Sequence, residues 1–349
     1  MLQENYDNAG LLTGNSAWEC TGVIVALDAI EMVLQEAIDN NCNLVVAHHP
    51  IIFNGLKKLT GKNYVEKIII RAIKNDIAIY AIHTNLDNVM WGVNGKMADK
   101  LGLINRQVLQ HKNKLLKKLV VFVPATHAEI LKEAIFAEGA GQIGNYSECS
   151  FNTAGEGTFK GGQGANPFIG KPGERTIADE IKVEVIYPDW LEQPILKAMH
   201  LAHPYEEIAY DIFSLENKHQ QLGSGLVGDF PQPVSESECL QVLKQQFNLS
   251  AIRHTSFTGK MIQRVALCGG AGSFLISSSI ASGAQIFITA DIKYHEFFDA
   301  DGKILVADIG HYESEQFTID LLFDILKENF TTFAVLKTGV KTNPVQYFL

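Results

Sequence analysis

Residues 44–50 have the sequence Leu-Val-Val-Ala-His-His-Pro, a short apolar run that ends in two histidines and a proline. Similar apolar runs occupy residues 23–27 and 77–82, and amphipathic segments over Glu31–Ile38 and Tyr64–Ile73 separate the three. Short Val- and Ile-rich strands that alternate with helices predict a parallel sheet covered on both faces. Functional groups in such sheets gather at the carboxyl ends of the strands. The histidine pair follows one of these ends.

The same alternation resumes after residue 223. Strands are expected over 226–230, 265–268, 285–289, 303–307 and 332–336, and helices over 237–247, 274–282 and 311–327. The sequence therefore predicts an α/β fold, with one α/β domain interrupted by an inserted module.

The interruption begins after a basic patch, Lys112–Lys118, which we interpret as a solvated linker rather than a nucleic-acid contact. Expected elements follow as strand 119–123, helix 126–138, a glycine-rich stretch over 139–173, strand 181–187, helix 190–202 and strand 208–215. If the glycine-rich stretch contains one or two strands, the order is β-α-β-β-α-β, a ferredoxin-like module. The predicted domains are residues 1–117 and 223–349 for the split α/β domain and 118–222 for the insert.

Composition excludes several classes of protein. The 349 residues are 46% hydrophobic and 19% charged, as in a globular protein with its own core, and the net charge of −10 argues against nucleic-acid binding. The five cysteines include no Cys-x-x-Cys pair, which argues for a reducing compartment and against cysteine-ligated zinc. The N-terminal residues show no signal peptide, and the uncharged stretch 265–290 contains too many serines and glycines for a membrane span. We expect a soluble cytoplasmic protein.

Two polar clusters lie at predicted strand ends in the first half. His48 and His49 can serve two metal ions, or one ion and one hydrogen bond, because adjacent residues leaving a strand point to opposite sides. His83 and Asp87 follow the next strand, and Asn85 and Asn88 share their loop. Taken alone, the histidine pair is better explained as two polar loop residues, and Asp87 competes as a turn or helix-cap residue.

The third cluster is residues 308–315, Asp-Ile-Gly-His-Tyr-Glu-Ser-Glu. If a helix begins near His311, then His311 and Glu315 lie on one face, one turn apart, as a pair of metal ligands. Asp308 can cap that helix. The alternative is a surface helix with an acidic first turn.

Together the three clusters favour a metal site. They combine imidazole and carboxylate without thiolate, which suits Zn, Fe, Mn or Ni in a non-structural site. Five or six such ligands exceed the needs of one four-coordinate ion, so a carboxylate that bridges two ions is the economical arrangement.

Two further motifs follow predicted strands. In residues 289–296, His295 can act as a general base or hold a substrate, with Asp291 orienting its ring; a supporting hydrogen-bond network without a chemical step is the alternative. The glycine-rich turn 268–273 can present backbone N–H groups to a phosphate, but it lacks the Lys-Ser/Thr ending of a P-loop. Tight strand-to-helix packing explains that turn better.

The order of these motifs resembles that of the NIF-three-like family, whose bacterial members are known as GTP cyclohydrolase 1 type 2 homologs. The resemblance rests on four motifs, Glu4–Leu11, His48–Pro50, His83–Asp87 and Asp308–Glu315. The middle of the chain, with Gly139–Tyr146 and His203–Glu207, is similar to the CutA-like (PII-like) insert of the longer bacterial members.

Two departures from the family pattern stand out. Family members usually carry a helix ahead of the first motif, on which this sequence almost begins. Ala290 occupies a position where glycine is usual.

The resemblance implies two divalent metal ions per chain, held by His48, His49, Asp87, His311 and Glu315. Glu315 would be the bridge, and His83 would lie nearby as a possible extra ligand. It also implies a toroidal homohexamer whose metal sites face an internal cavity.

The leading hypothesis is a metal-dependent hydrolase of a nucleotide-like or phosphate-bearing small molecule, with His295 or His83 managing protons. Ring opening of GTP, the cyclohydrolase reaction, is one specific version. One alternative is a regulatory or scaffold module that binds metal without turnover, and another is a metal chaperone or store.

Overall fold

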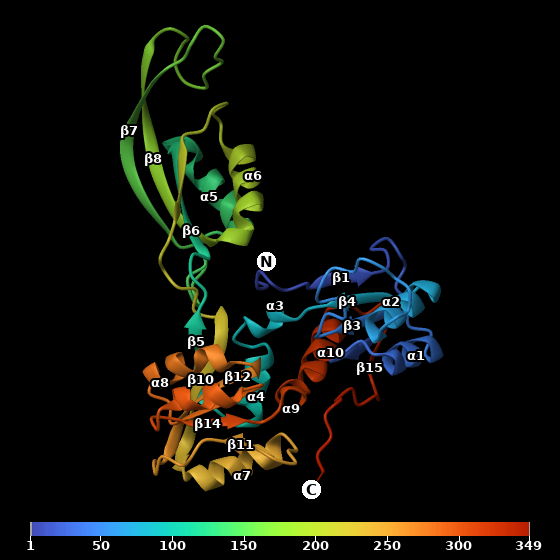
Figure 1. The fold of residues 1–349 in the computed structure, drawn as a ribbon. Helices are drawn as coiled ribbons and strands as arrows, with labels where there is room; N and C mark the ends of the chain where they lie inside the picture. The colour runs from blue at the N-terminus through green and yellow to red at the C-terminus, as the bar shows by residue number, and fades with distance from the viewer. Residues whose placement is uncertain (1, 349) are drawn as a thin grey trace. The chain divides into compact units, whose positions relative to one another are not determined.

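The computed structural model describes residues 2–348, and the chain divides into two compact units (Figure 1). The main unit comprises Met1–His111 and Gln221–Leu349, and the inserted unit comprises Lys112–Gln220. Among the described residues, none of the helices combines the length and the apolar character needed to cross a membrane.

The first sheet of the main unit has the strand order β1-β4-β3-β2-β15. Its strands are β1 (Gly10–Thr13), β2 (Gly22–Ala26), β3 (Leu44–Ala47), β4 (Ala78–Ala81) and β15 (Ala334–Lys337). All neighbours pair in parallel except β1, which runs antiparallel to β4 at the edge. Helices α1 (Glu31–Asp39) and α2 (Tyr64–Lys74) bury Val33, Leu34, Ile68 and Ile69 against this sheet. The side chain of Asn63 caps α2 by accepting the N–H of Glu66.

The second sheet of the main unit has the order β11-β14-β13-β12-β10-β5. Its strands are β5 (Ile104–His111), β10 (Gly223–Val234), β11 (Arg253–His254), β12 (Ile262–Ala271), β13 (Ile286–Ala290) and β14 (Leu305–Asp308). The central strands β12, β13 and β14 are parallel, and the others are antiparallel to their neighbours.

Helices cover both faces of this second sheet. The helices α4 (Val93–Lys100) and α7 (Glu236–Gln246) contribute to one core cluster, and α8 (Ile276–Ala281) with the 3-10 helix η4 (Tyr294–Ala300) contributes to another. Helix α7 begins at a capping box formed by Ser235 and Glu238. The short α3 (Thr84–Asp87) and α9 (His311–Glu315) follow strand ends, and α10 (Thr318–Asn329) leads to β15.

The inserted unit has an antiparallel sheet of order β7-β8-β6-β9. Its elements are β6 (Leu116–Pro124), the 3-10 turn η1 (Ala125–His127), α5 (Ala128–Ala137), β7 (Ser150–Lys160), β8 (Arg175–Pro188), the turn η2 (Asp189–Leu191), α6 (Glu192–Ala202) and β9 (Tyr210–Ser214). Figure 1 shows α5 and α6 on one face of the long curved strands β7 and β8. Leu131, Ile135 and Met199 of these helices pack on Val183 and Val185.

Several expected elements differ from those observed. The split domain contains two sheets, and the sequence did not predict two of their edge strands, β1 and the mostly polar β5. The basic patch is a linker only in its first part: residues 112–115 lie outside any strand, whereas Lys117 lies in β6 and pairs with Glu192. The glycine-rich stretch does contain a strand, β7.

The helix expected over 311–327 is two helices, α9 and α10. The side-chain amide of Gln316 donates to the backbone carbonyl of Phe247, and Phe317 packs against the Phe247 ring with centroids 5.8 Å apart. These contacts anchor the junction to the end of α7 and interrupt the helix.

Candidate metal centre

The carboxyl ends of parallel strands from both sheets of the main unit supply one cluster of side chains. His48 and His49 follow β3, and His83 follows β4 at the start of α3, which ends in Asp87. From the second sheet, β14 leads through Gly310 into α9, which carries His311 and Glu315.

Glu315 is the centre of the cluster. Its Oε2 atom lies 2.8 Å from Nε2 of His49, 3.1 Å from Nε2 of His311 and 3.7 Å from Nε2 of His48. The Oδ1 atom of Asp87 lies 3.5 Å from Nε2 of His48. The predicted placement of His311 and Glu315 on one helical face is confirmed, because both side chains meet in this cluster.

The two adjacent histidines converge on the same carboxylate oxygen, although adjacent strand residues point to opposite sides. Both lie beyond the last residue of β3, so the strand alternation no longer applies to them. Their ring centroids are 4.8 Å apart.

His48 is the least satisfied member of the cluster. It is completely buried, and among residues 2–348 neither of its ring nitrogens has a hydrogen-bond partner. The buried Oδ1 of Asp87 also lacks one. An unpaired buried polar group costs about 1–3 kcal/mol, so an ion that accepts these lone pairs would remove a substantial penalty. Ligand atoms of His48, His49 and Glu315 lie within 4.8 Å of one another, close enough to hold one metal ion.

Aspartates hold the other ring nitrogens of three histidines. Oδ1 of Asp28 lies 2.7 Å from Nδ1 of His49, and Oδ2 of Asp291 lies 2.6 Å from Nδ1 of His311. This pairing fixes the tautomer and directs Nε2 toward the cluster, as in many metal sites. The prediction that Asp291 orients His295 is therefore wrong, because the carboxylate faces His311 instead.

His83 has the third such partner, Asp7, whose Oδ1 lies 2.6 Å from Nδ1. Asp7 also accepts hydrogen bonds from the backbone and side chain of Thr84. His83 has a positive φ of 40°, a strained conformation for a residue with a side chain. The Asp7 contact helps to hold it.

Burial and hydrogen bonding shift the pKa values in opposite directions. Burial acts to raise the pKa of Glu315, yet the hydrogen bond from His311 and the nearby imidazole of His48 bring it well below its usual range. Burial and the neighbouring Glu315 charge raise the pKa of Asp87 well above its usual range. Burial acts to lower the pKa of His49, and its contacts with Asp28 and Glu315 raise it to about 9. The negative charge of Glu315 thus attracts cations to this point, whether protons or metal ions.

Two glycines make room for the carboxylates. A Cβ atom on Gly270 would lie 2.4 Å from Oε1 of Glu315, and one on Gly310 would lie 2.3 Å from Oε2 of Glu313. Both glycines also have positive φ, 62° and 91°. The N–H of Gly270 donates to the Ser314 hydroxyl, and that of Gly269 donates to the side chain of Asn94. The packing interpretation of the turn 268–273 therefore fits better than a phosphate cradle.

A cavity of about 530 Å³ opens onto the cluster. Its lining includes Phe53, His83, Arg253, His311, Tyr312 and Tyr347. His295 is exposed on η4, stacked on Phe298, and is not among the lining residues.

Asp308 does not cap α9 directly. Its Oδ1 accepts the N–H of Gly310, while Oδ2 accepts that of Ile292 and pairs with Arg253.

Sequence reasoning missed Asp7 and Asp28 as partners of the histidines. Asp7 lies within the Glu4–Leu11 motif, and Asp28 comes two residues after β2 ends. His48 was located because polar residues just beyond the end of a parallel strand are often functional, and the same rule applies to Asp28.

The fold and the cluster define a class: an α/β protein with a buried imidazole and carboxylate site able to hold a metal ion. The chain belongs to the Duf34/NIF3 (NGG1p interacting factor 3) family, whose model matches residues 1–344. This confirms the family resemblance of the motifs.

Named relatives match over most of their length. A GTP cyclohydrolase 1 type 2 homolog of Halalkalibacterium halodurans is 39% identical over 347 residues, covering 98% of this chain and 93% of that protein. The homolog of Bacillus subtilis is 37% identical over 308 residues, covering 88% and 83%. The crystal structure of a Bacillus cereus protein related to NIF3 is similar with a TM-score of 0.87 and 36% identity, covering 99% of this chain and 94% of that one.

Proposed function

We propose that the main unit binds two divalent metal ions through His48, His49, Asp87, His311 and Glu315, with Glu315 as the bridging ligand. The observation that carries the proposal is the buried His48 ring beside the Glu315 carboxylate, whose two nitrogens have no hydrogen-bond partner in the part of the chain that the structure describes. The mixed imidazole and carboxylate set suits Zn, Fe, Mn or Ni.

The reaction proposed for this site is hydrolysis of a nucleotide-like or phosphate-bearing small molecule. Two divalent ions supply Lewis acidity and activate water for such chemistry. The cavity of about 530 Å³ has the size of a small-molecule site, and Phe53 and Tyr347 give it aromatic walls. The names of the relatives, GTP cyclohydrolase 1 type 2 homologs, support a purine nucleotide among the substrates to be tried first.

His83 is the residue best placed to move a proton in this reaction. It lines the cavity, and Asp7 holds its Nδ1, so that Nε2 is left to exchange a proton with the substrate or with water. The catalytic role of His295 stays a prediction. The pair of variants His83→Gln and His295→Gln separates the two: loss of turnover with metal retained in one variant would assign the proton transfer to that residue.

The test is metal content per chain by elemental analysis, followed by a nucleotide and phosphoester panel with the metal-loaded protein. We expect about two ions per chain in the wild type, and fewer in a His311→Ala, Glu315→Ala variant. Arg71→Ala, which removes a surface ion pair with Glu31 on α1, is the matched control and should keep both ions. One ion or none in the wild type would remove the dinuclear proposal, and no turnover on the whole panel would remove the hydrolase.

A metal-binding regulatory or scaffold module is the second candidate, and one observation favours it. The inserted unit contains a cavity of about 680 Å³ with Phe122, Phe159 and Tyr205 in its lining. The strand order of this unit supports a ferredoxin-like, CutA-like or PII-like module over residues 118–222, between parts 1–117 and 223–349 of the metal-binding domain. Full metal loading without turnover would favour this candidate.

We also propose a toroidal homohexamer in the cytoplasm. Tyr294, Phe298 and Phe274 of the main unit are large exposed side chains suited to subunit contacts, and the cysteines are unpaired. Light scattering coupled to size-exclusion chromatography tests the assembly, and a monomer would contradict it.

A further inference from the structure

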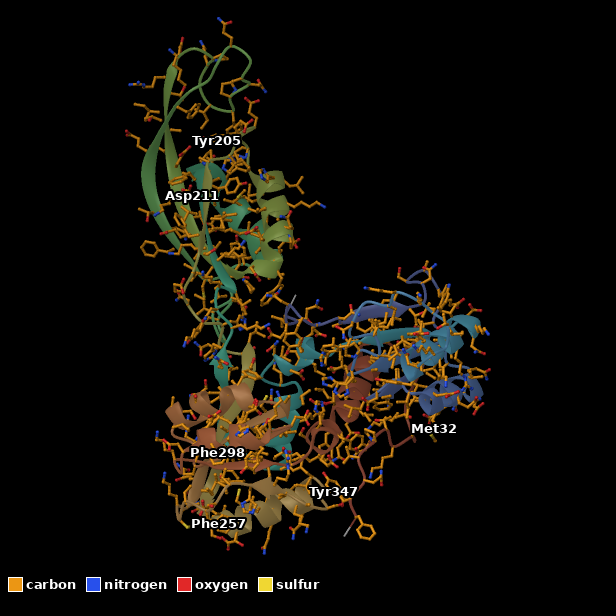
Figure 2. The ribbon with its side chains drawn as sticks, viewed as in Figure 1. Met32, Tyr205, Asp211, Phe257, Phe298 and Tyr347 are labelled. Atoms are coloured by element: carbon orange, nitrogen blue, oxygen red, sulfur yellow. The ribbon has the colours of Figure 1, made fainter. Side chains whose placement is uncertain are left out.

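The segment that follows β15, Thr338–Tyr347, contains no helix or strand and is called here the C-terminal strap. Figure 1 shows it as the red coil between β15 and the C-terminus, and Figure 2 labels Tyr347 near its end. The N–H of Thr338 donates to the carbonyl of Val25, and the Thr338 hydroxyl donates to Glu36. The strap is therefore anchored first on the β2 and α1 side of the first sheet.

Farther along, two adjacent polar residues of the strap are buried. Thr342 is 7% exposed, and its Oγ1 donates to Oδ2 of Asp28 at 2.5 Å. Asn343 is 9% exposed, and its Nδ2 donates to Oε1 of Glu313 at 2.9 Å.

These two hydrogen bonds connect the strap to residues beside the metal cluster, one residue that follows a strand of the first sheet and one that follows a strand of the second. Asp28 holds Nδ1 of His49 through its other oxygen, Oδ1. Glu313 lies in α9, between His311 and Glu315. The strap thus contacts one carboxylate beside each group of proposed ligands.

Thr342 limits how the Asp28 carboxylate can turn. The Asp28 side chain is 31% exposed, so water can compete for its oxygens. With Thr342 on one oxygen and His49 on the other, rotation of the carboxylate breaks a hydrogen bond. A carboxylate fixed in this way keeps the imidazole oriented and basic, which strengthens its bond to a metal.

We propose that Thr342 is a positioning residue of the metal centre, acting through Asp28 on His49; this rests on the metal site proposed above. The strap is then part of the site, although none of its residues is a ligand. The prediction concerns metal affinity and requires no assumption about the substrate.

The experiment measures Zn²⁺ and Co²⁺ affinity of the full chain by competition with a chromophoric chelator, together with the visible spectrum of the Co²⁺ form. Thr342→Val removes the donor with little change in shape, and we expect an affinity loss of about 10-fold, the lower end of the range for groups that orient a ligand. The Co²⁺ spectrum should change as well. Thr342→Ser keeps a hydroxyl and should restore both.

Thr338→Val is the matched control, because it removes a hydroxyl from the same strap whose partner is Glu36 rather than Asp28. It should keep wild-type affinity and spectrum. Equal affinity losses in Thr338→Val and Thr342→Val would mean that the strap acts only through stability, and no loss in Thr342→Val would also overturn the proposal.

A double-mutant cycle with Asp28→Asn tests whether Thr342 acts on the metal centre through Asp28. If Thr342 acts through Asp28, adding Thr342→Val to Asp28→Asn costs no further affinity, whereas full additivity of the two effects contradicts the proposal. If Thr342→Val folds poorly, Thr342→Ala, which also removes the hydroxyl, replaces it in the cycle. Absence of Zn²⁺ and Co²⁺ binding in the wild type would instead contradict the proposed metal centre itself. This result is distinct from the outcomes that concern Thr342.

Discussion

Two buried histidines, one in each unit, show how differently the same side chain can be used. His203 in the inserted unit is 6% exposed, and both ring nitrogens are satisfied: Nε2 lies 2.9 Å from the carbonyl of Phe122, and Nδ1 accepts the N–H of Tyr205. His48 in the main unit is fully buried, with neither nitrogen paired within the described residues. Burial alone therefore does not mark a ligand. A buried imidazole whose hydrogen bonds are incomplete, as that of His48, is the better candidate for one.

The largest expected effect concerns the charge beside His48. Glu315→Gln keeps the shape of the side chain but removes the negative charge that three imidazoles surround. Losing one partner of a buried charge pair costs about 3–5 kcal/mol, and a loss of that size in binding free energy corresponds to roughly 10²–10⁴-fold in metal affinity. Isothermal titration calorimetry with Zn²⁺ measures this loss of affinity. His203→Gln, far along the chain in the inserted unit, should bind Zn²⁺ as the wild type does, and equal losses in both variants would contradict the distinction.

A smaller loss is expected from Gly270→Ala. The added methyl group meets Oε1 of Glu315 and forces that carboxylate to move, and alanine at φ of 62° adds about 1–2 kcal/mol of backbone strain. Gly302→Ala separates these causes, because Gly302 also has φ of 62° but has open space where the methyl group would lie. Both variants should lower the melting temperature of the metal-free protein. Only Gly270→Ala should weaken Zn²⁺ binding, and a matching loss in Gly302→Ala would show that strain alone is responsible.

Removing the satisfied histidine should affect stability only. His203→Ala leaves the Phe122 carbonyl and the Tyr205 N–H without their partner, at a cost of about 1–3 kcal/mol. Urea unfolding followed by Trp190 in a Trp18→Phe, Trp91→Phe background reports on the inserted unit, since Trp190 is its sole tryptophan. Metal content should not change. Loss of metal in this variant would mean that the two units are not independent in this respect.

The sequence predicted what depends on local pattern. Strand β3 was expected over Leu44–Ala47 and is observed there, and the one-turn spacing of His311 and Glu315 predicted their shared face. These follow from strand and helix periodicity, which act over a few residues.

The partners that complete the cluster depend on long-range packing instead. Thr342 and Asp28 are 314 positions apart, and His49 and Glu315 are 266 apart. No local pattern relates such residues. Gly270 shows the same limit in part: its positive φ belongs to the local turn, but the carboxylate of Glu315 that an added methyl group would meet belongs to a distant helix.

The smallest expected effect is a pH dependence confined to the inserted unit. Burial lowers the pKa of His203 below its ordinary value of 6.5, and the hydrogen bond to Phe122 only partly offsets this. The folded unit therefore resists protonation that the unfolded chain accepts. Stability from this group is complete above pH 6.5 and is lost as the pH falls from there through the lower pKa of the folded state. In the Trp190 reporter background, the urea concentration at the unfolding midpoint should decrease when the pH is lowered from 7 to 5. His203→Gln cannot titrate, yet its amide can still donate to the Phe122 carbonyl, so its midpoint should depend less on pH. A slope equal to that of the wild type would assign the effect to other groups and would weaken the view that His203 is held neutral by burial.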